Sequence, residues 1–159
     1  MMHLVLIGFM ASGKSTFAKQ LSASLKLPVF STDDWISSQT QLSISEIFTS
    51  YGENEFRVWE QRAYRVIMDL EQRYIIDCGG GFILQGRMKE LGRVYYLDVS
   101  LEIIEKRLCG KERQKRPLSK DFKELYIQRK RLYEKESLLK VNQIEEIIED
   151  WKRINAPLP

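Results

Sequence analysis

The sequence predicts an α/β domain whose parallel sheet is covered by helices on both faces. Five short apolar runs, each of a length typical of a buried strand, alternate with segments whose apolar residues recur at helical spacing. The first run, Leu4 to Ile7, leads directly into the glycine-rich segment Gly8 to Thr16, and a helical pattern follows that segment. Such chains form parallel sheets whose ligands bind beyond the carboxyl ends of the strands.

The segment Gly8 to Thr16, GFMASGKST, matches the pattern G-x-x-x-x-G-K-[ST] of a phosphate-binding P-loop between a strand and a helix. Gly8 and Gly13 allow backbone N–H groups to approach phosphate oxygens, and the positive end of the following helix adds to their field. Lys14 is expected to reach the outer phosphates, and the Ser15 hydroxyl is expected to bind Mg²⁺. We therefore expect a nucleoside triphosphate here, contacted by Gly8, Ala11, Ser12, Gly13, Lys14, Ser15 and Thr16.

The next elements are expected in the following order. Residues 28–30 form a second strand, which ends at a polar segment. Ser43 and Glu46 form a capping box that opens a short helix. Gly52 ends that helix, and a long helix with one apolar stripe follows from about residue 53 to about residue 71.

The second half of the chain continues the alternation. A third strand, residues 74–76, runs into the triple glycine Gly79 to Gly81, and a helix near residues 86–91 leads to a fourth strand at 94–97. A helix is expected over residues 101–108.

The last third of the chain begins with residues 110–121, which contain five basic and two acidic side chains and read as a solvated loop. Residues 122–136 are expected to form a helix and residues 138–141 the last strand. Asn142 with Glu145 is expected to cap a final amphipathic helix.

The composition fits a single domain covering residues 1–159. Hydrophobic residues make up 43% of the chain and charged residues 30%, with a net charge of +3. That charge suits a site for anionic small molecules and does not indicate a nucleic-acid partner. No run of 18 apolar residues occurs, so we expect no membrane span and, by default, a cytoplasmic location. We also expect a monomer. The two cysteines lack metal-ligand spacing, and the single histidine, His3, lies far from the P-loop, which disfavours a zinc ion or a His base.

Three further segments are candidates for the ligand site. Asp33 is a carboxylate at a strand end and could act as a general base or hydroxyl anchor, or only as a helix N-cap. Gly79 to Gly81 could let backbone amides approach a ligand, or could form a plain loop. Arg129 falls on the apolar face of its helix and needs an anion, either a ligand or a structural carboxylate such as Glu60 or Asp33. Arg57 lies beside the apolar stripe of the long helix, and this position alone does not distinguish a ligand-binding arginine from a solvated one.

Together these motifs resemble the shikimate kinase family over nearly the whole chain. That family has a P-loop, D-x-D at the end of the second strand, F-R opening a long helix, G-G-G, an R-P-L lid and an R-x-x-L-Y helix. The corresponding segments here are Gly8–Thr16, Ser31–Asp33, Phe56–Arg57, Gly79–Gly81, Arg116–Leu118 and Arg129–Tyr133. The resemblance implies a three-layer fold like that of nucleoside monophosphate kinases, with strand order 2-3-1-4-5 and a lid at residues 110–121.

The resemblance also implies a reaction, in which ATP phosphorylates the 3-hydroxyl of shikimate. Asp33 would anchor and deprotonate that hydroxyl. Arg57 and Arg129 would bind the substrate carboxylate, aided by amides of Gly79, Gly80 and Gly81, and residues 32–60 would form the substrate-binding segment.

The same resemblance assigns the nucleotide side of the site. Mg²⁺ would accompany ATP at Ser15, and Arg116 would move with the lid onto the transferred phosphoryl group. Arg107 matches, less closely, an arginine that stacks on adenine. Phosphoryl transfer depends mainly on such positioning and charge neutralisation, and a lid that excludes water would limit wasteful hydrolysis.

The chain departs from the family at three places. Ser31 replaces the first Asp of D-x-D, whose family role is to steady Mg²⁺ through its water shell, so we expect a raised Mg²⁺ requirement unless Asp34 compensates. Arg131 replaces a proline, and the loop around Asn142 that would border adenine is nearly absent. The alternatives are a related kinase for gluconate or a nucleoside monophosphate, and a degenerate paralogue that binds nucleotide and regulates a partner.

Overall fold

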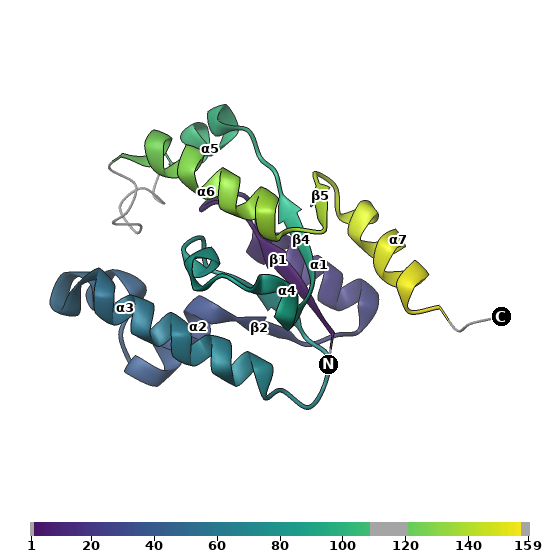
Figure 1. The fold of residues 1–159 in the computed structure, drawn as a ribbon, viewed down its shortest axis with the longest axis horizontal. Coiled ribbons are helices and arrows are strands. Elements are labelled where there is room, and N and C mark those ends of the chain that lie inside the picture. Colours follow the sequence, from purple (N-terminus) through teal and green to yellow (C-terminus); the bar gives the residue numbers. More distant parts are fainter. Residues whose placement is uncertain (1, 109–120, 157–159) are drawn as a thin grey trace.

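Five parallel strands form one sheet in the order β2-β3-β1-β4-β5 (Figure 1). The computed structural model describes residues 2–108 and 121–156. The strands are β1 (His3–Ile7), β2 (Val29–Ser31), β3 (Ile75–Asp77), β4 (Gly92–Leu97) and β5 (Leu139–Val141). The α/β class and the strand order implied by the family resemblance are confirmed.

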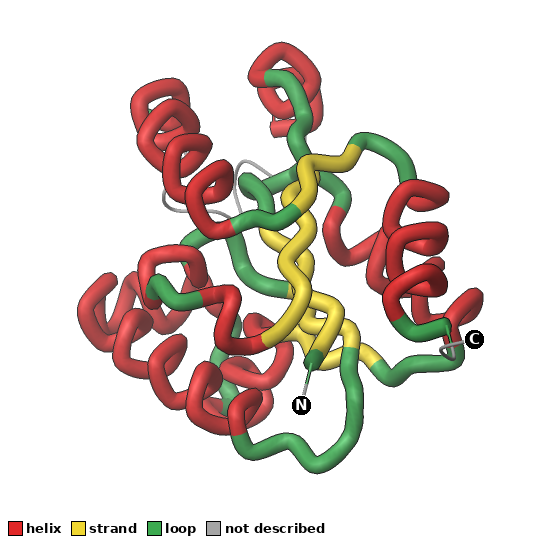
Figure 2. Tube along the Cα trace, turned by 45° about the vertical axis from the view of Figure 1, so that its right-hand side comes forward, coloured by secondary structure: helices red, strands yellow, loops and turns green. Residues whose placement is uncertain are grey.

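Helices connect the strands and lie on both sides of the sheet, as Figure 2 shows. They are α1 (Lys14–Leu25), α2 (Thr32–Thr40), α3 (Ile44–Met68), the 3₁₀ helix η1 (Phe82–Gln85), α4 (Met88–Leu91), α5 (Leu101–Arg107), α6 (Phe122–Glu136) and α7 (Ile144–Ile154).

Most of these elements match the sequence prediction, and the differences have local causes. Helix α2 was not predicted, because residues 31–34 were interpreted as the end of a strand. Gly52 interrupts α3, with φ 83° and ψ 173°, where the sequence placed a break. The capping box of α7 is formed by Gln143 and Glu146, not by Asn142 with Glu145.

Two hydrophobic cores cover the two faces of the sheet. All five residues of β1 are buried, and successive side chains point to opposite faces, so a continuous apolar run is what a central parallel strand requires. Leu4 and Leu6 pack with α1 and α7. Val5 and Ile7 belong to the other core, to which α2, α3, η1, α4, α5 and α6 contribute.

The amino edge of the sheet is held together by a buried histidine. His3, at the amino end of β1, contacts the Ile67 carbonyl through Nε2 and the Tyr74 N–H through Nδ1, and burial lowers its pKa. This imidazole therefore joins the end of α3 to β3 and stays distant from the carboxyl edge, where the P-loop lies. Within the described residues, no helix has the length and apolar character needed to cross a membrane.

Candidate functional site

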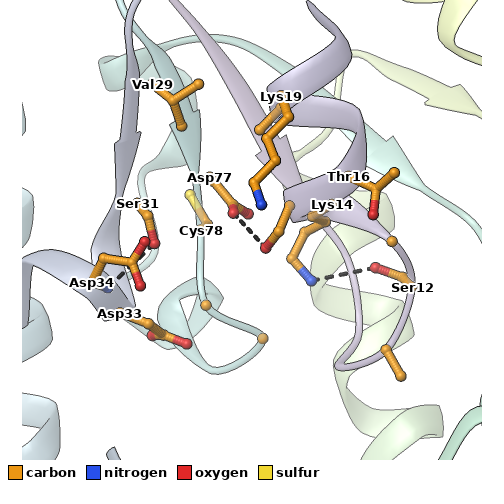
Figure 3. A pocket seen from close by; sticks show the side chains of 16 residues that line it. Ser12, Lys14, Thr16, Lys19, Val29, Ser31, Asp33, Asp34, Asp77 and Cys78 are labelled. Carbon is orange, nitrogen blue, oxygen red and sulfur yellow. Dashed lines mark hydrogen bonds between the residues drawn. The ribbon is translucent and has the colours of Figure 1, made fainter. Parts of the chain in front are cut away.

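The carboxyl ends of β1, β2 and β3 meet at a cavity of about 490 Å³ (Figure 3). Three segments line it: the P-loop and first turn of α1, the junction of β2 with α2, and the residues that follow β3. The P-loop contribution runs from Ala11 to Thr16. This volume falls within the roughly 300–1,000 Å³ typical of small-molecule sites, at the edge where parallel sheets bind ligands.

Lys14, the first residue of α1, is enclosed by the P-loop. Its side-chain nitrogen donates to the carbonyl oxygens of Gly8 at 2.8 Å and Phe9 at 2.9 Å, and to Ser12 Oγ at 3.3 Å. The lysine is 7% exposed, so a concentrated positive charge sits inside the loop. Such a charge attracts the anionic oxygens that the sequence pattern predicted for this position.

The backbone conformation of the P-loop would be strained by larger residues at its glycine positions. A Cβ at Gly8 would lie 3.0 Å from the Leu97 carbonyl, and Gly13 has φ 96°. Ala11 also has a positive φ, 59°, and its carbonyl accepts a 2.7 Å hydrogen bond from Arg107 on α5. The predicted nucleotide residue Arg107 therefore lies directly against the phosphate loop.

Asp33 lies in the first turn of α2 and lines the cavity. The cap of this helix is Ser31, whose Oγ accepts from the Asp34 N–H at 3.2 Å, so the alternative interpretation of Asp33 as the N-cap is wrong. A Cβ at Gly79 would overlap the Asp33 carboxylate. The Gly79 N–H donates to Thr32 Oγ1 at 2.8 Å, so this glycine makes room for Asp33 and fixes the start of α2.

Arg57 on α3 is held by two carboxylates. Its guanidinium donates to Glu60 at 2.7 Å and to Glu53 at 2.8 Å, and the Glu60 side chain is 0% exposed. A Cβ at Gly81 would overlap this guanidinium. Burial raises the pKa of Glu60, the Arg57 charge opposes that rise, and the Asp33 carboxylate reinforces it. Arg57, Glu60 and Asp33 thus form one electrostatic group around the triple glycine.

Arg129 on α6 reaches the same glycine segment from the other side. It is 5% exposed and donates to the Gly80 carbonyl at 2.9 Å, which also accepts from the Tyr133 hydroxyl at 2.7 Å. Burial lowers the pKa of Arg129, and the nearby Arg57 charge lowers it further. Among the described residues, no carboxylate forms an ion pair with Arg129. Glu60 acts on this charge only without direct contact, and the charge is therefore suited to an anionic ligand.

The expected lid and its arginine, Arg116, lie outside the described residues, apart from Asp121 at the end of that segment. The structure therefore brings together the P-loop, Asp33, the triple glycine, Arg57, Arg107 and Arg129. Four of the predicted residues lie outside the cavity lining itself: Arg57, Gly81, Arg107 and Arg129. Arg129 bonds the lining residue Gly80, Arg107 bonds the lining residue Ala11, and Arg57 lies against Gly81.

Sequence reasoning missed two carboxylates of this region. Asp77, the last residue of β3, accepts a 2.7 Å hydrogen bond from Ser15 Oγ and lines the cavity. The sequence signal was present, because an acid directly after the apolar pair Ile75 and Ile76 lies at a strand end, as the P-loop does. Glu60 was considered only as a possible partner of Arg129, whereas its i,i+3 spacing on α3 places it beside Arg57.

Comparisons with known proteins agree with this architecture. The shikimate kinase family model matches residues 10–155. A shikimate kinase of Helicobacter hepaticus is 36% identical over 157 residues, covering 97% of this chain and 94% of that protein. A shikimate kinase of Clostridium botulinum is 38% identical over 146 residues, covering 85% of this chain and 84% of the relative.

Solved structures give the same result. The shikimate kinase of Aquifex aeolicus superposes with a TM-score of 0.78 at 30% identity, covering 98% of this chain and all of that one. The Acinetobacter baumannii shikimate kinase in complex with shikimate has a TM-score of 0.86, covering 99% and 96% of the two chains; at 22% identity it supports the fold alone. Since the family model spans most of the chain and the two relatives exceed 30% identity over 84% and 94% of their length, the chain belongs to the shikimate kinase family.

Proposed function

We propose that this chain transfers the γ-phosphoryl group of ATP to the 3-hydroxyl of shikimate. The observation that carries the proposal is the pair of guanidiniums of Arg57 and Arg129 at the triple glycine, beside Asp33 and next to a P-loop. The buried carboxylate of Glu60 and the half-exposed carboxylate of Glu53 hold Arg57, whereas Arg129 forms no ion pair with a carboxylate among the described residues. A hydroxy acid supplies both groups that this arrangement needs, a carboxylate for the arginines and a hydroxyl for Asp33.

On the acceptor side, Asp33 anchors the reacting hydroxyl and takes its proton, because its carboxylate lines the cavity beside the triple glycine, near Arg57 and Glu60. The substrate lies along the segment formed by residues 32–60, with Arg57 and Arg129 on its carboxylate. Gly79 leaves space for the Asp33 carboxylate and Gly81 for the Arg57 guanidinium, whereas Gly80 packs closely against the backbone of Met10.

On the donor side, backbone amides of the P-loop and Lys14 would hold the phosphates, and Arg107, which donates to the Ala11 carbonyl, would stack on adenine. Ser15 binds Mg²⁺, which when bound neutralises charge on the nucleotide phosphates. The donor set fits this ion, since the Ser15 hydroxyl and the Asp77 carboxylate are hard oxygen ligands. Arg116 supports the transferred phosphoryl group from the lid. A cytoplasmic location and a monomeric state remain predictions from the sequence.

The test is an ADP-release assay with ATP, Mg²⁺ and, separately, shikimate, gluconate and nucleoside monophosphates. Shikimate-dependent ADP release, lost in Arg129→Ala at low substrate concentration, is the expected result. ADP release with gluconate or a nucleoside monophosphate but not with shikimate would assign a related kinase. ATP binding without turnover on any acceptor would favour the regulatory paralogue.

A further inference from the structure

Ser31 caps helix α2, at the position where the family resemblance predicts a carboxylate that steadies Mg²⁺. It is the last residue of β2, with extended φ and ψ of −90° and 123°, and its hydroxyl accepts from the Asp34 N–H. Figure 3 shows the side chain of Ser31 beside Asp34. The hydroxyl therefore caps α2, and no negative charge is present at this position.

Asp77 occupies the equivalent position on the neighbouring strand. The register pairs it with Ser31 on β2 and with Leu6 on β1, so Asp77 lies one strand closer to the P-loop. Its Oδ2 atom accepts the 2.7 Å hydrogen bond from Ser15 Oγ, and the residue is 7% exposed. The hydroxyl assigned to Mg²⁺ is thus already oriented by a buried carboxylate.

We propose that Asp77 is the carboxylate that positions Mg²⁺ at the phosphate loop, and that this function has moved across the sheet from the end of β2 to the end of β3. The inference rests on the proposed function, because it assumes that a nucleotide with Mg²⁺ binds at Ser15. Mg²⁺ in phosphate sites keeps several waters and takes one or two protein carboxylates besides the phosphates. Asp77 supplies the negative charge and orients Ser15, as carboxylates around metal ligands do.

The other carboxylates of the cavity are less suited to this task. Asp34 is exposed on the first turn of α2, and its backbone N–H is bound by Ser31. Asp33 faces the triple glycine and is assigned to the acceptor hydroxyl. The described residues contain no cluster of three or more His, Cys, Asp or Glu side chains that could hold a metal. Asp77 is the carboxylate in hydrogen-bond contact with Ser15.

The test compares ADP affinity by calorimetry in Mg²⁺ and in EDTA, for the parent protein and Asp77→Asn. We expect the Mg²⁺-dependent gain in ADP affinity to fall about tenfold, since loss of a carboxylate supporting a metal ligand costs about 10–100-fold. The ADP affinity of Asp77→Asn in EDTA is expected not to decrease, because the substitution removes a negative charge near the phosphates. A Mg²⁺-dependent gain equal to that of the parent would overturn the proposal.

Two further variants make the result specific. Asp34→Asn is the matched control in the same cavity and should keep the parent's Mg²⁺-dependent gain; an equal loss in this variant would also overturn the proposal. Ser31→Asp, added to Asp77→Asn, is expected to restore the gain, because Asp caps a helix as well as Ser and returns a carboxylate to the paired position. If a thermal melt shows Asp77→Asn unfolded, Asp77→Ser replaces it.

This readout separates the inference from the proposed function. It uses ADP and Mg²⁺ alone, so neither shikimate nor turnover enters the measurement. Absence of shikimate-dependent turnover in a protein that binds Mg²⁺ and ADP through Asp77 would refute the proposed function and leave the role of Asp77 supported.

Discussion

Replacing Arg57 with Ala should destabilise the fold, whereas replacing Arg129 with Ala should not, although both arginines are proposed to bind the same substrate carboxylate. Without Arg57, Glu60 is left as a fully buried carboxylate whose Oε1 has no hydrogen-bond partner among the described residues, and whose Oε2 keeps only Gln85 at 3.5 Å. Without Arg129, a hydrogen bond to Gly80 is lost, but a desolvated positive charge is removed as well.

The expected magnitudes differ accordingly. Removing one partner of a buried ion pair costs about 3–5 kcal/mol, which at this chain length corresponds to a decrease in Tm of roughly 6–20 °C. The Arg129→Ala change should stay within about 1 kcal/mol, because the lost hydrogen bond is offset by the relieved desolvation. Both variants should raise the KM for shikimate, since the proposed contacts exist before and during the reaction.

The cost of Arg57→Ala should also depend on pH. Burial raises the pKa of Glu60 above 4.5 in the folded state, and loss of Arg57 removes the main opposing influence. A carboxyl with a raised folded pKa favours folding only below its unfolded value, so stability is lost as pH rises through the folded pKa. The destabilisation by Arg57→Ala should therefore be small near pH 4.5 and grow toward pH 8.

Urea unfolding at pH 5 and pH 8 measures this difference, with Arg129→Ala as the matched control. The double variant Arg57→Ala, Glu60→Gln should recover most of the lost stability at pH 8, since an amide replaces the buried charge. Equal, pH-independent effects of the two arginine variants would refute the electrostatic assignment of Glu60. Full destabilisation persisting in the double variant would do the same.

Three further predictions concern the reacting groups. Lys14→Ala should abolish ADP release while the thermal melt still shows a folded protein; near-parent activity would rule out the P-loop assignment. Asp33→Asn should lower kcat by about 10²–10⁴-fold with little change in KM, and an unchanged kcat would reduce Asp33 to an anchor. Gly79→Ala should also lower kcat, because the new Cβ would displace the Asp33 carboxylate; in the Asp33→Asn background the same substitution should add little if that displacement is its main effect.

The sequence by itself determined the fold class and the local conformation of the P-loop. A P-loop is one continuous stretch of sequence, and its geometry depends on residues that are neighbours in the chain. A single segment therefore encodes the strand, the positive φ at Gly13 and the helix beginning at Lys14. The apolar runs fixed which segments are buried, and the ordered motifs indicated the family whose strand order the structure shares.

Tertiary structure decided how the distant side chains pair. Ser15 and Asp77 are 62 residues apart, and only the parallel register of β1, β2 and β3 brings them into contact. A small shift in an element boundary changed the role of Ser31, which the sequence placed beyond the second strand and the structure uses as the cap of α2.

The same limit applies around the two arginines that we propose to bind substrate. The pattern on α3 and α6 showed that Arg57 and Arg129 occur near apolar stripes, but not that a buried Glu60 forms an ion pair with Arg57 and none with Arg129. Helical and strand periodicity report which face a residue occupies, because local backbone geometry sets that face. Which charges meet depends on how the faces of separate elements pack together, and that is determined only in the folded chain.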